Sequence, residues 1–436
     1  MCGPWRSSGR PSPRLWTIWA ADLSPNTFLP GGLGRGADAA ESPLSRENTT
    51  MRVDVYESVN SLDTQAWDTL AAHKSFYMGT GWLRFQEKMN PEQRCRFITV
   101  SDGGRLIAAL PTFLTPRPAN KHYNVAAMFP DAVSEDTHVL LVGGTRGYQS
   151  RILLDDDALS PEHRGIAVGL LVDHVQAMAD QDADGVSWWL YFSDEDVELL
   201  RPWAQTIPRV LRGDCAIDLH GHSFEDYLAA TGRRRQIMRD RRRFDRTGYT
   251  VRRRPLSELL SVAGDLLSKT QNRYGFDVSP QSMTNVLTVQ NEATGNTGVV
   301  YECADGDETL GFCLAYEAGD TIYGRAVGFD YDRLRDGAEY FTLGYYAPIE
   351  HAYRSGMRRL HLGTSAYEAK ILRGAAITPL WAIALGARPW LSERAIEHNA
   401  AKLAEISALL PDGPRYENRV TSTLWHEFAS LSRSEL

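Results

Sequence analysis

Arginines are concentrated in the segment GRRRQIMRDRRRFDRTGYTVRRR, residues 232–254, which contains eleven arginines and two acidic residues, Asp240 and Asp245. Every basic residue in this segment is arginine, although lysine would serve solubility equally well. The planar guanidinium group binds phosphate or carboxylate through paired hydrogen bonds, whereas the lysine ammonium group acts as a point charge. The segment therefore indicates a surface for an anionic ligand. A solvated basic face is the alternative interpretation.

The order of residues around these arginines predicts an amphipathic helix over residues 223–248. Ser223 is a favourable N-cap residue, Asp226 follows three residues later, and no proline intervenes. At roughly 100° per residue, Ile237 and Phe244 lie on one side of this helix. The opposite side carries the four arginines that we predict to bind the anion: Arg235, Arg239, Arg242 and Arg246. A strand, YTVRRR, would follow and widen the basic surface.

The chain as a whole is acidic, with a formal net charge of −8 over 436 residues. This charge does not indicate a general nucleic-acid or membrane binder, and no apolar run reaches the roughly 20 residues that cross a bilayer. Five scattered cysteines without a Cys-x-x-Cys pair are typical of reduced thiols in a cytoplasmic protein. The close pair His220 and His222 lacks further ligands at metal-binding spacing. We expect no metal site, no cofactor and no membrane span.

The elements that must position a site follow one order twice along the chain, namely three strands, a helix and a further strand. Alternating and apolar runs predict strands, and periodic apolar residues predict helices. In the first half these segments are 96–100, 105–114, 137–144, 161–181 and 186–192. In the second half they are 298–305, 309–318, 321–330, 337–356 and 358–363. This order predicts an α/β (α+β) fold of two similar units, each a mixed sheet flanked by helices.

Changes in composition suggest the domain boundaries. Residues 1–50 are rich in Pro, Gly, Ser and Arg, and we expect a disordered tail or sequence upstream of a start at Met51, where the strand MRVDVYESV begins. We predict a first domain at 51–215. The second domain, 216–436, includes the arginine-rich helix and ends with the strand TPLWAIAL and two helices that cap it. A chain of this length exceeds one ordinary hydrophobic core.

The second half resembles the C-terminal half of the Fem-type branch of the GNAT acyltransferase superfamily, in the group often labelled peptidoglycan-biosynthesis-like acyltransferases. The similarity covers residues 215–385 and rests on RRRQIMRDRRRF, IYGRAVGFDYD and YFTLGYYAPIEHAYRSGMRRLHLGTSAYEAKILRG. Ala369 stands where the group usually has a histidine, just before the lysine. The resemblance implies tandem GNAT-like units that transfer an acyl or aminoacyl group to an amine or hydroxyl. The signature at the end of the domain is Gly363, Lys370, Arg373 and Gly374.

The same resemblance, together with the arginines, indicates the chemical class of the acyl donor. Most GNAT enzymes hold the pyrophosphate of acyl-CoA in an Arg/Gln-x-x-Gly-x-Gly/Ala loop at a helix N-terminus. The near match here, Arg325 to Asp330, ends in a carboxylate that would repel phosphate. Fem-type relatives take the aminoacyl group from aminoacyl-tRNA, which an arginine-rich helix suits. The resemblance thus implies transfer from aminoacyl-tRNA to a small amine or hydroxyl(amine) acceptor, as in natural-product (antibiotic) or cell-wall precursor biosynthesis.

Two other functions remain open. One is an acyl-CoA-dependent N-acyltransferase that uses the degenerate loop. The other is a non-catalytic nucleic-acid-binding protein, against which the acidic remainder and the aromatic second half weigh. The oligomeric state, the transferred group and the acceptor are not determined by the sequence.

Acyl transfer needs a proton acceptor, stabilisation of the oxyanion and orientation of both substrates. Under the resemblance, Lys370 would stabilise the oxyanion or hold the terminal phosphate of the donor, and Glu368 or Asp330 would be the base. The full catalytic set that we predict is Lys370, Glu368, Tyr323 and Asp330, with Arg373 joining the four helix arginines at the donor. The acceptor cleft would contain Arg325, Tyr345 and Tyr346. Packing of the tyrosines and surface positions for Lys370 and Arg373 are the alternative interpretations.

Overall fold

The computed structural model describes residues 51–115, 120–130, 138–386, 391–410 and 418–431. The predicted tail at residues 1–50 lies outside these ranges. Within them, no helix is both long enough and apolar enough to cross a membrane.

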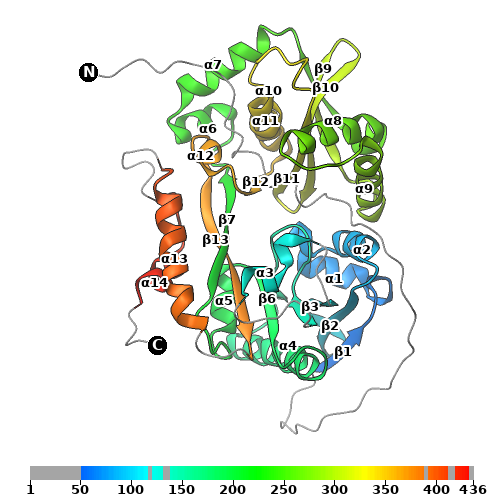
Figure 1. Ribbon diagram of the computed structural model, residues 1–436, viewed down its shortest axis with the longest axis vertical. Coiled ribbons are helices and arrows are strands. Elements are labelled where there is room, and N and C mark those ends of the chain that lie inside the picture. Colours follow the sequence, from blue (N-terminus) through cyan, green and yellow to red (C-terminus); the bar gives the residue numbers. More distant parts are fainter. Residues whose placement is uncertain (1–50, 116–119, 131–137, 387–390, 411–417, 432–436) are drawn as a thin grey trace.

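The first unit is built on four antiparallel strands followed by a helix and a parallel strand (Figure 1). Strand β6 pairs in parallel with β4, because α4 carries the chain back over the sheet. These elements confirm the strands and the helix predicted for the first half. The main elements are β1 (Arg52–Tyr56), β2 (Arg94–Asp102), β3 (Arg105–Thr115), β4 (Val139–Val142), α4 (Pro161–Asp182) and β6 (Ser187–Phe192). The smaller ones are α1 (Thr64–Ala71), α2 (Thr80–Met89), α3 (Val125–Met128), β5 (Leu153–Leu154) and α5 (Asp194–Leu200).

The second unit repeats this order and confirms the repeat inferred from the sequence. Its predicted central helix is interrupted by a π-helical segment, η7 (Thr342–Tyr346), between two α-helical parts, and ends at Gly356 in the left-handed conformation. Strand β12 pairs in parallel with β11, as β6 does with β4. The elements are β8 (Thr250–Pro255), α8 (Leu260–Arg273), α9 (Pro280–Ala293), β9 (Val299–Asp305), β10 (Glu308–Ala318), β11 (Thr321–Phe329), α10 (Glu339–Phe341), α11 (Ala347–Ser355) and β12 (Arg359–Thr364).

The two units are joined by an exchange of their last strands. Strand β7 (Arg209–Asp218), which follows the first unit, pairs with β12 of the second, and β13 (Ala376–Leu385), which follows the second, pairs with β6 of the first. Because β7 and β13 also pair with each other, a 13-stranded sheet runs through both units. The predicted boundary at residue 215 lies within β7, and the division into two domains stays a prediction.

The predicted arginine-rich helix is two helices, α6 (Phe224–Thr231) and α7 (Arg234–Asp245). The prediction of one helix was wrong because Gly232 adopts the left-handed conformation, with φ of 62°, and ends α6. Ser223 is the N-cap of α6, as predicted, and its hydroxyl accepts a hydrogen bond from the Asp226 backbone N–H. The strand YTVRRR is confirmed as β8.

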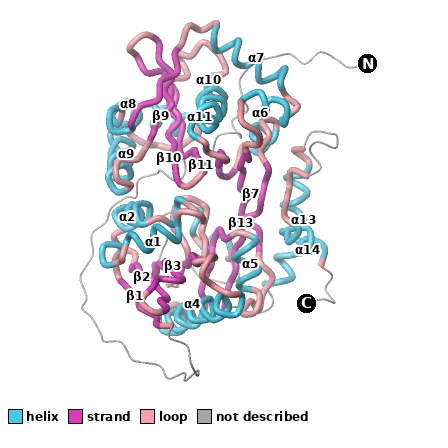
Figure 2. The backbone as a smooth tube through the Cα atoms, turned by 180° about the vertical axis from the view of Figure 1, so that it is seen from behind, coloured by secondary structure: helices cyan, strands magenta, loops and turns pink. Residues whose placement is uncertain are grey.

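The C-terminal helices α13 (Leu391–Ser407) and α14 (Thr423–Ser430) lie along β7 and β13 (Figures 1 and 2). We expected these helices to cap the second domain, but they cover the junction between the units. Asn399 of α13 explains this position, because its side chain bonds the Val210 N–H and the Pro208 carbonyl at the start of β7. The helices therefore stabilise the exchanged strands.

Candidate functional site

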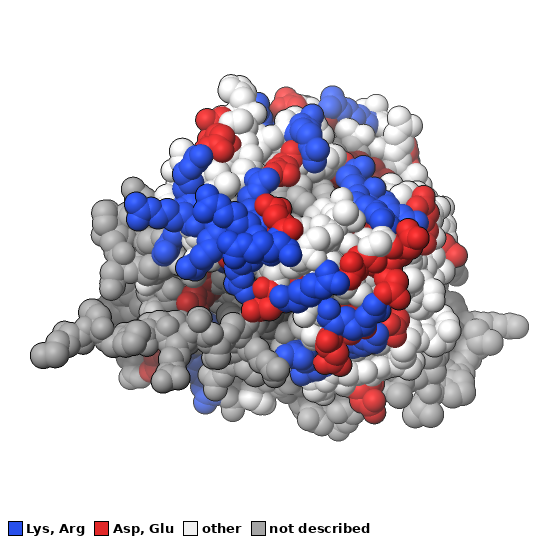
Figure 3. Space-filling model, turned by 90° about the horizontal axis from the view of Figure 1, so that it is seen from above, with Lys and Arg blue, Asp and Glu red and all other residues white. Residues whose placement is uncertain are grey.

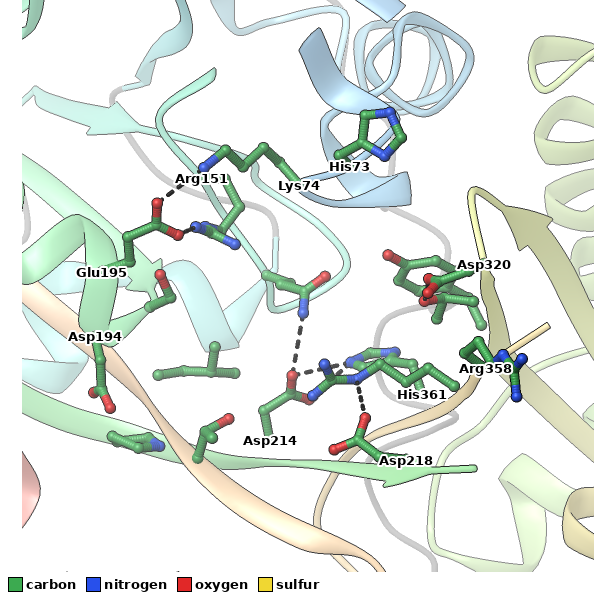
Figure 4. A pocket seen from close by; sticks show the side chains of 18 residues that line it. His73, Lys74, Arg151, Asp194, Glu195, Asp214, Asp218, Asp320, Arg358 and His361 are labelled. Carbon is green, nitrogen blue, oxygen red and sulfur yellow. Dashed lines mark hydrogen bonds and ion pairs between the residues drawn. The ribbon is translucent and has the colours of Figure 1, made fainter. Parts of the chain in front are cut away.

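A cavity of about 390 Å³ lies between the two units, and we call it the interunit cavity (Figure 4). Both units and the exchanged strands contribute to its wall. The side chains that matter below are Lys74 and Arg151 from the first unit, Asp214 from β7, and Tyr323 and His361 from the second unit. Residues of both units and of the exchanged strands thus meet in one cavity.

Two neighbouring strands of the second unit, β11 and β12, separate at the point where they meet this cavity. Strands β11 and β12 pair at Thr321–Tyr323 with Arg359–His361, and beyond Tyr323 β11 pairs with β10 but not with β12. The last paired residues, Tyr323 and His361, line the cavity. Their side chains thus stand where the two parallel strands begin to separate.

Asp214 and His361 form a buried pair in the cavity wall (Figure 4). The Nε2 atom of His361 lies 2.9 Å and 3.0 Å from the two carboxylate oxygens of Asp214. Gln149 donates a second hydrogen bond to Asp214 at 3.2 Å, and Ser75 in turn donates to the Gln149 side-chain oxygen at 2.6 Å. With Nε2–H donated to the carboxylate, the lone pair of the neutral ring resides on Nδ1. Among the described residues, Nδ1 has no hydrogen-bond partner.

Aromatic rings fix the orientation of His361. The Tyr323 ring lies 5.1 Å and the Tyr77 ring 6.0 Å from the imidazole, measured between centroids. Tyr77 belongs to the short helix η4 (Phe76–Met78) of the first unit, so the ring is held by residues from both units. Burial raises the pKa of Tyr323, which keeps its hydroxyl neutral.

Two cations of the interunit cavity, Lys74 and Arg151, are paired with acids from the first unit. Lys74 lies 2.6 Å from Asp156 and 2.9 Å from Glu195, and Arg151 lies 2.8 Å from Asp196 and also contacts Glu195. Arg358 and Arg359 also line the cavity, as do Asp214, Asp218 and Asp320, so neither charge is in large excess. A small polar molecule fits this environment better than a polyanion does.

Residues 231–370 match the family of acetyltransferase (GNAT) domains. This match contains α7 and all elements from β8 to β12. The chain contains a GNAT acetyltransferase domain. No curated protein matches the sequence significantly.

Solved structures share the fold of this GNAT protein at low sequence identity. FemX is 12% identical, the alignment covers 79% of this chain and 100% of FemX, and the TM-score is 0.56. This likeness shows a Fem-like fold. A tandem GNAT protein from the clavulanic acid biosynthesis pathway is 12% identical, with 77% and 97% coverage and a TM-score of 0.41. L-PGS from Bacillus licheniformis is 12% identical, with 75% and 93% coverage and a TM-score of 0.43.

The GNAT domain does not bring all the predicted catalytic residues together. Tyr323 lines the interunit cavity, whereas Glu368 is exposed on α12 (Tyr367–Ile371) and Asp330 pairs with Lys269 at 2.9 Å. Lys370 is fully buried, and its Nζ donates to the carbonyl oxygens of Gly363 and Thr364, both at 2.8 Å. These two hydrogen bonds hold the last residues of β12 in place. The catalytic roles of these residues stay predictions.

Arg373, Tyr345 and Tyr346 lie beneath α7 and do not line the interunit cavity. Arg373 bonds the Asp240 carboxylate at 3.0 Å, and the Tyr346 hydroxyl donates to the same carboxylate at 2.8 Å. Tyr345 is completely buried, with its hydroxyl 3.3 Å from that of Tyr340. Arg373 therefore fixes the buried side of α7 through Asp240. Arg325, which we predicted in the acceptor cleft, lies over the Trp82 ring at 5.0 Å.

The outer side of α7 is the basic face predicted from the sequence (Figure 3). Ile237 and Phe244 are buried on its inner side, as the spacing indicated. Within the described part of the chain, Arg235, Arg242 and Arg246 contact no acidic side chain, and Arg239 bonds only the uncharged Gln236. The basic face thus consists of four exposed guanidinium groups without counter-charges: Arg235, Arg239, Arg242 and Arg246.

The segment that resembles a pyrophosphate loop is part of a buried strand. Arg325 to Phe329 belongs to β11, and the next helix begins only at Glu339. A Cβ atom at Gly328 would lie 2.4 Å from a ring carbon of Phe312 and 2.7 Å from the backbone nitrogen of Leu267. Gly328 therefore lets α8 pack on the sheet, and its amide does not face a ligand loop.

We predict that Gly328→Ala lowers the free energy of unfolding by about 1–3 kcal/mol, because the α8 backbone cannot yield to the added methyl group. Urea denaturation measures this change. Gly165→Ala is the matched control, since a Cβ atom there meets nothing within 4 Å and the residue lies inside α4. A Gly328→Ala protein of unchanged stability that loses donor affinity would contradict the packing role.

Sequence reasoning missed Asp214 and His361. Each is a polar residue within a buried strand, in GDCAID and RRLHLG, and that placement was the available signal. A charged or titratable residue in such a run needs a partner, but the sequence does not name the partner.

Proposed function

We propose that this protein transfers an aminoacyl group from an aminoacyl-tRNA to the amine or hydroxyl of a small acceptor, such as a natural-product or cell-wall precursor. The observation that carries the proposal is the basic face of α7, which presents four exposed arginines on an acidic protein. A polyphosphate chain is the ligand that such a row of uncompensated guanidinium groups binds.

The strand β11 adds support, because its Arg325–Phe329 segment is not an open loop for the pyrophosphate of acyl-CoA. The interunit cavity has the size of a site for a small molecule. The two substrates would thus occupy different places: the tRNA on the surface around α7, and the acceptor between the units.

The donor class is tested by offering the purified protein radiolabelled aminoacyl-tRNAs and acyl-CoAs with a mixture of small primary amines. We expect amine-dependent deacylation of at least one aminoacyl-tRNA and no release of CoA thiol. Release of thiol while every labelled tRNA stays intact would establish the acyl-CoA-dependent alternative. Binding of tRNA without any transfer would favour the non-catalytic alternative.

We predict that Arg235→Ala combined with Arg239→Ala weakens binding of the donor tRNA and flattens its salt dependence. Loss of two phosphate contacts reduces the slope of log K against log salt by about 2. Filter binding at several salt concentrations measures both quantities. Arg94→Ala with Arg105→Ala is the control, because these arginines are similarly exposed on β2 and β3. Unchanged affinity for tRNA in the α7 double variant would show that the basic face is a solvated surface and not the donor site.

A further inference from the structure

Burial of the Asp214–His361 pair costs more free energy than burial of an apolar pair at the same place would. The His361 and Asp214 side chains are 4% and 8% exposed, and burial of such groups costs free energy unless hydrogen bonds compensate. The compensation here is one-sided: Asp214 is bonded by His361 and Gln149, whereas Nδ1 of His361 has no partner among the described residues. Nδ1 of His361 is thus a ring nitrogen to which no described residue is hydrogen-bonded.

The position of the His361 ring relative to the fold is the second observation. His361 is the last residue of β12 that pairs with β11, and it lines the interunit cavity (Figure 4). Tyr323 lines the same cavity. An acceptor in the cavity would therefore lie beside the imidazole, at the opening between the two strands. Hydrogen bonds of catalytic groups often form only once the substrate is bound, and Nδ1 of His361 is buried and has no partner among the described residues.

We propose that His361 is the proton acceptor of the transfer reaction and that Asp214 is its positioning residue. The acceptor nitrogen attacks the ester carbonyl carbon, a C–N bond forms, and Nδ1 takes the proton released from nitrogen. When the C–O bond to the tRNA ribose breaks, the leaving oxygen takes that proton, and His361 returns to its neutral form. Asp214 holds the Nε2–H tautomer and stabilises the imidazolium cation between the two steps. This proposal rests on acyl transfer to a nucleophile and does not require that the donor be tRNA.

The experiment measures the rate of amine-dependent deacylation, with whichever donor the wild-type protein uses. We expect His361→Ala to lower this rate by about 10²-fold or more while donor affinity stays unchanged. Added imidazole should restore part of the rate in His361→Ala, and pyrrole, which has no basic nitrogen, should not. Asp214→Asn should lower the rate with little effect on KM for the amine.

His351→Ala is the matched control, because His351 also bonds a carboxylate, Glu317, at 3.0 Å but lies on α11 outside the interunit cavity. It should keep the wild-type rate. A His361→Ala protein that binds donor and retains the full rate would overturn the proposal. A folded variant that loses the rate without any rescue by imidazole would show a structural role and would also overturn it. A wild-type protein that uses acyl-CoA would refute the proposed donor and leave this test intact.

Discussion

Replacing Asp240 with alanine should lower the free energy of unfolding by about 3–5 kcal/mol, because it leaves a buried guanidinium group without its counter-charge. Asp240 is 1% exposed, and its carboxylate accepts hydrogen bonds from Arg373 at 3.0 Å, Tyr346 at 2.8 Å and Gln236 at 2.7 Å. Removal of the carboxylate breaks the three bonds together. The midpoint and slope of urea denaturation give the change.

Asp245→Ala is the matched control for this variant. Asp245 is exposed at the end of the same helix, so its loss should change the free energy of unfolding by less than about 0.5 kcal/mol. Combining Asp240→Leu with Arg373→Met should recover much of the stability, because both charges are then absent. Equal, small effects of Asp240→Ala and Asp245→Ala would show that the buried pair does not hold α7.

Substitution of Lys370 by methionine should remove a rise of stability between pH 8 and pH 10.5. Burial lowers the pKa of Lys370 from 10.5 to about 8. Below pH 8 both the folded and the unfolded chain carry this proton. Between pH 8 and 10.5 the unfolded chain binds more protons than the folded chain, so stability increases with pH. The difference of 10.5 − 8 = 2.5 corresponds to roughly 3 kcal/mol, which Lys370→Met should lack.

The measured quantity is the difference in free energy of unfolding between wild type and variant at pH 7 and pH 10, so that other titrating groups cancel. Lys402→Met is the control, because Lys402 is at the surface with Glu405 and should keep the wild-type pH dependence. If Lys370→Met shows the same rise as wild type, Lys370 is not the buried lysine that titrates in this range.

The strands and helices were predictable from the sequence because their signals are local. Alternation of apolar residues marked β9, β10 and β11, and the helical period placed Ile237 and Phe244 inside and the basic face outside. The break at Gly232 escaped the same reasoning. A single glycine inside a helical pattern either continues the helix or ends it, and contacts with the remainder of the fold decide between the two.

The exchange of β7 and β13 had no local signal at all. Each strand has an ordinary apolar pattern, and its partner is chosen by hydrogen bonds to residues more than a hundred positions away, as in the pairing of β13 with β6. The Lys370 and Arg373 side chains illustrate the same limit. Their predicted roles came from their residue types, whereas their burial and their contacts with a strand end and with Asp240 depend on the tertiary structure.

The sequence by itself determined the repeated order of elements, the amphipathic arginine helix and the resemblance to GNAT acyltransferases, since each depends on residues close together in the chain. Only the tertiary structure decided which polar residues meet. Asp214 and His361 are 147 positions apart and come together through the antiparallel pairing of β7 with β12. Such a contact depends on long-range strand pairing, whose free energy is shared among many residues and is visible in no single segment.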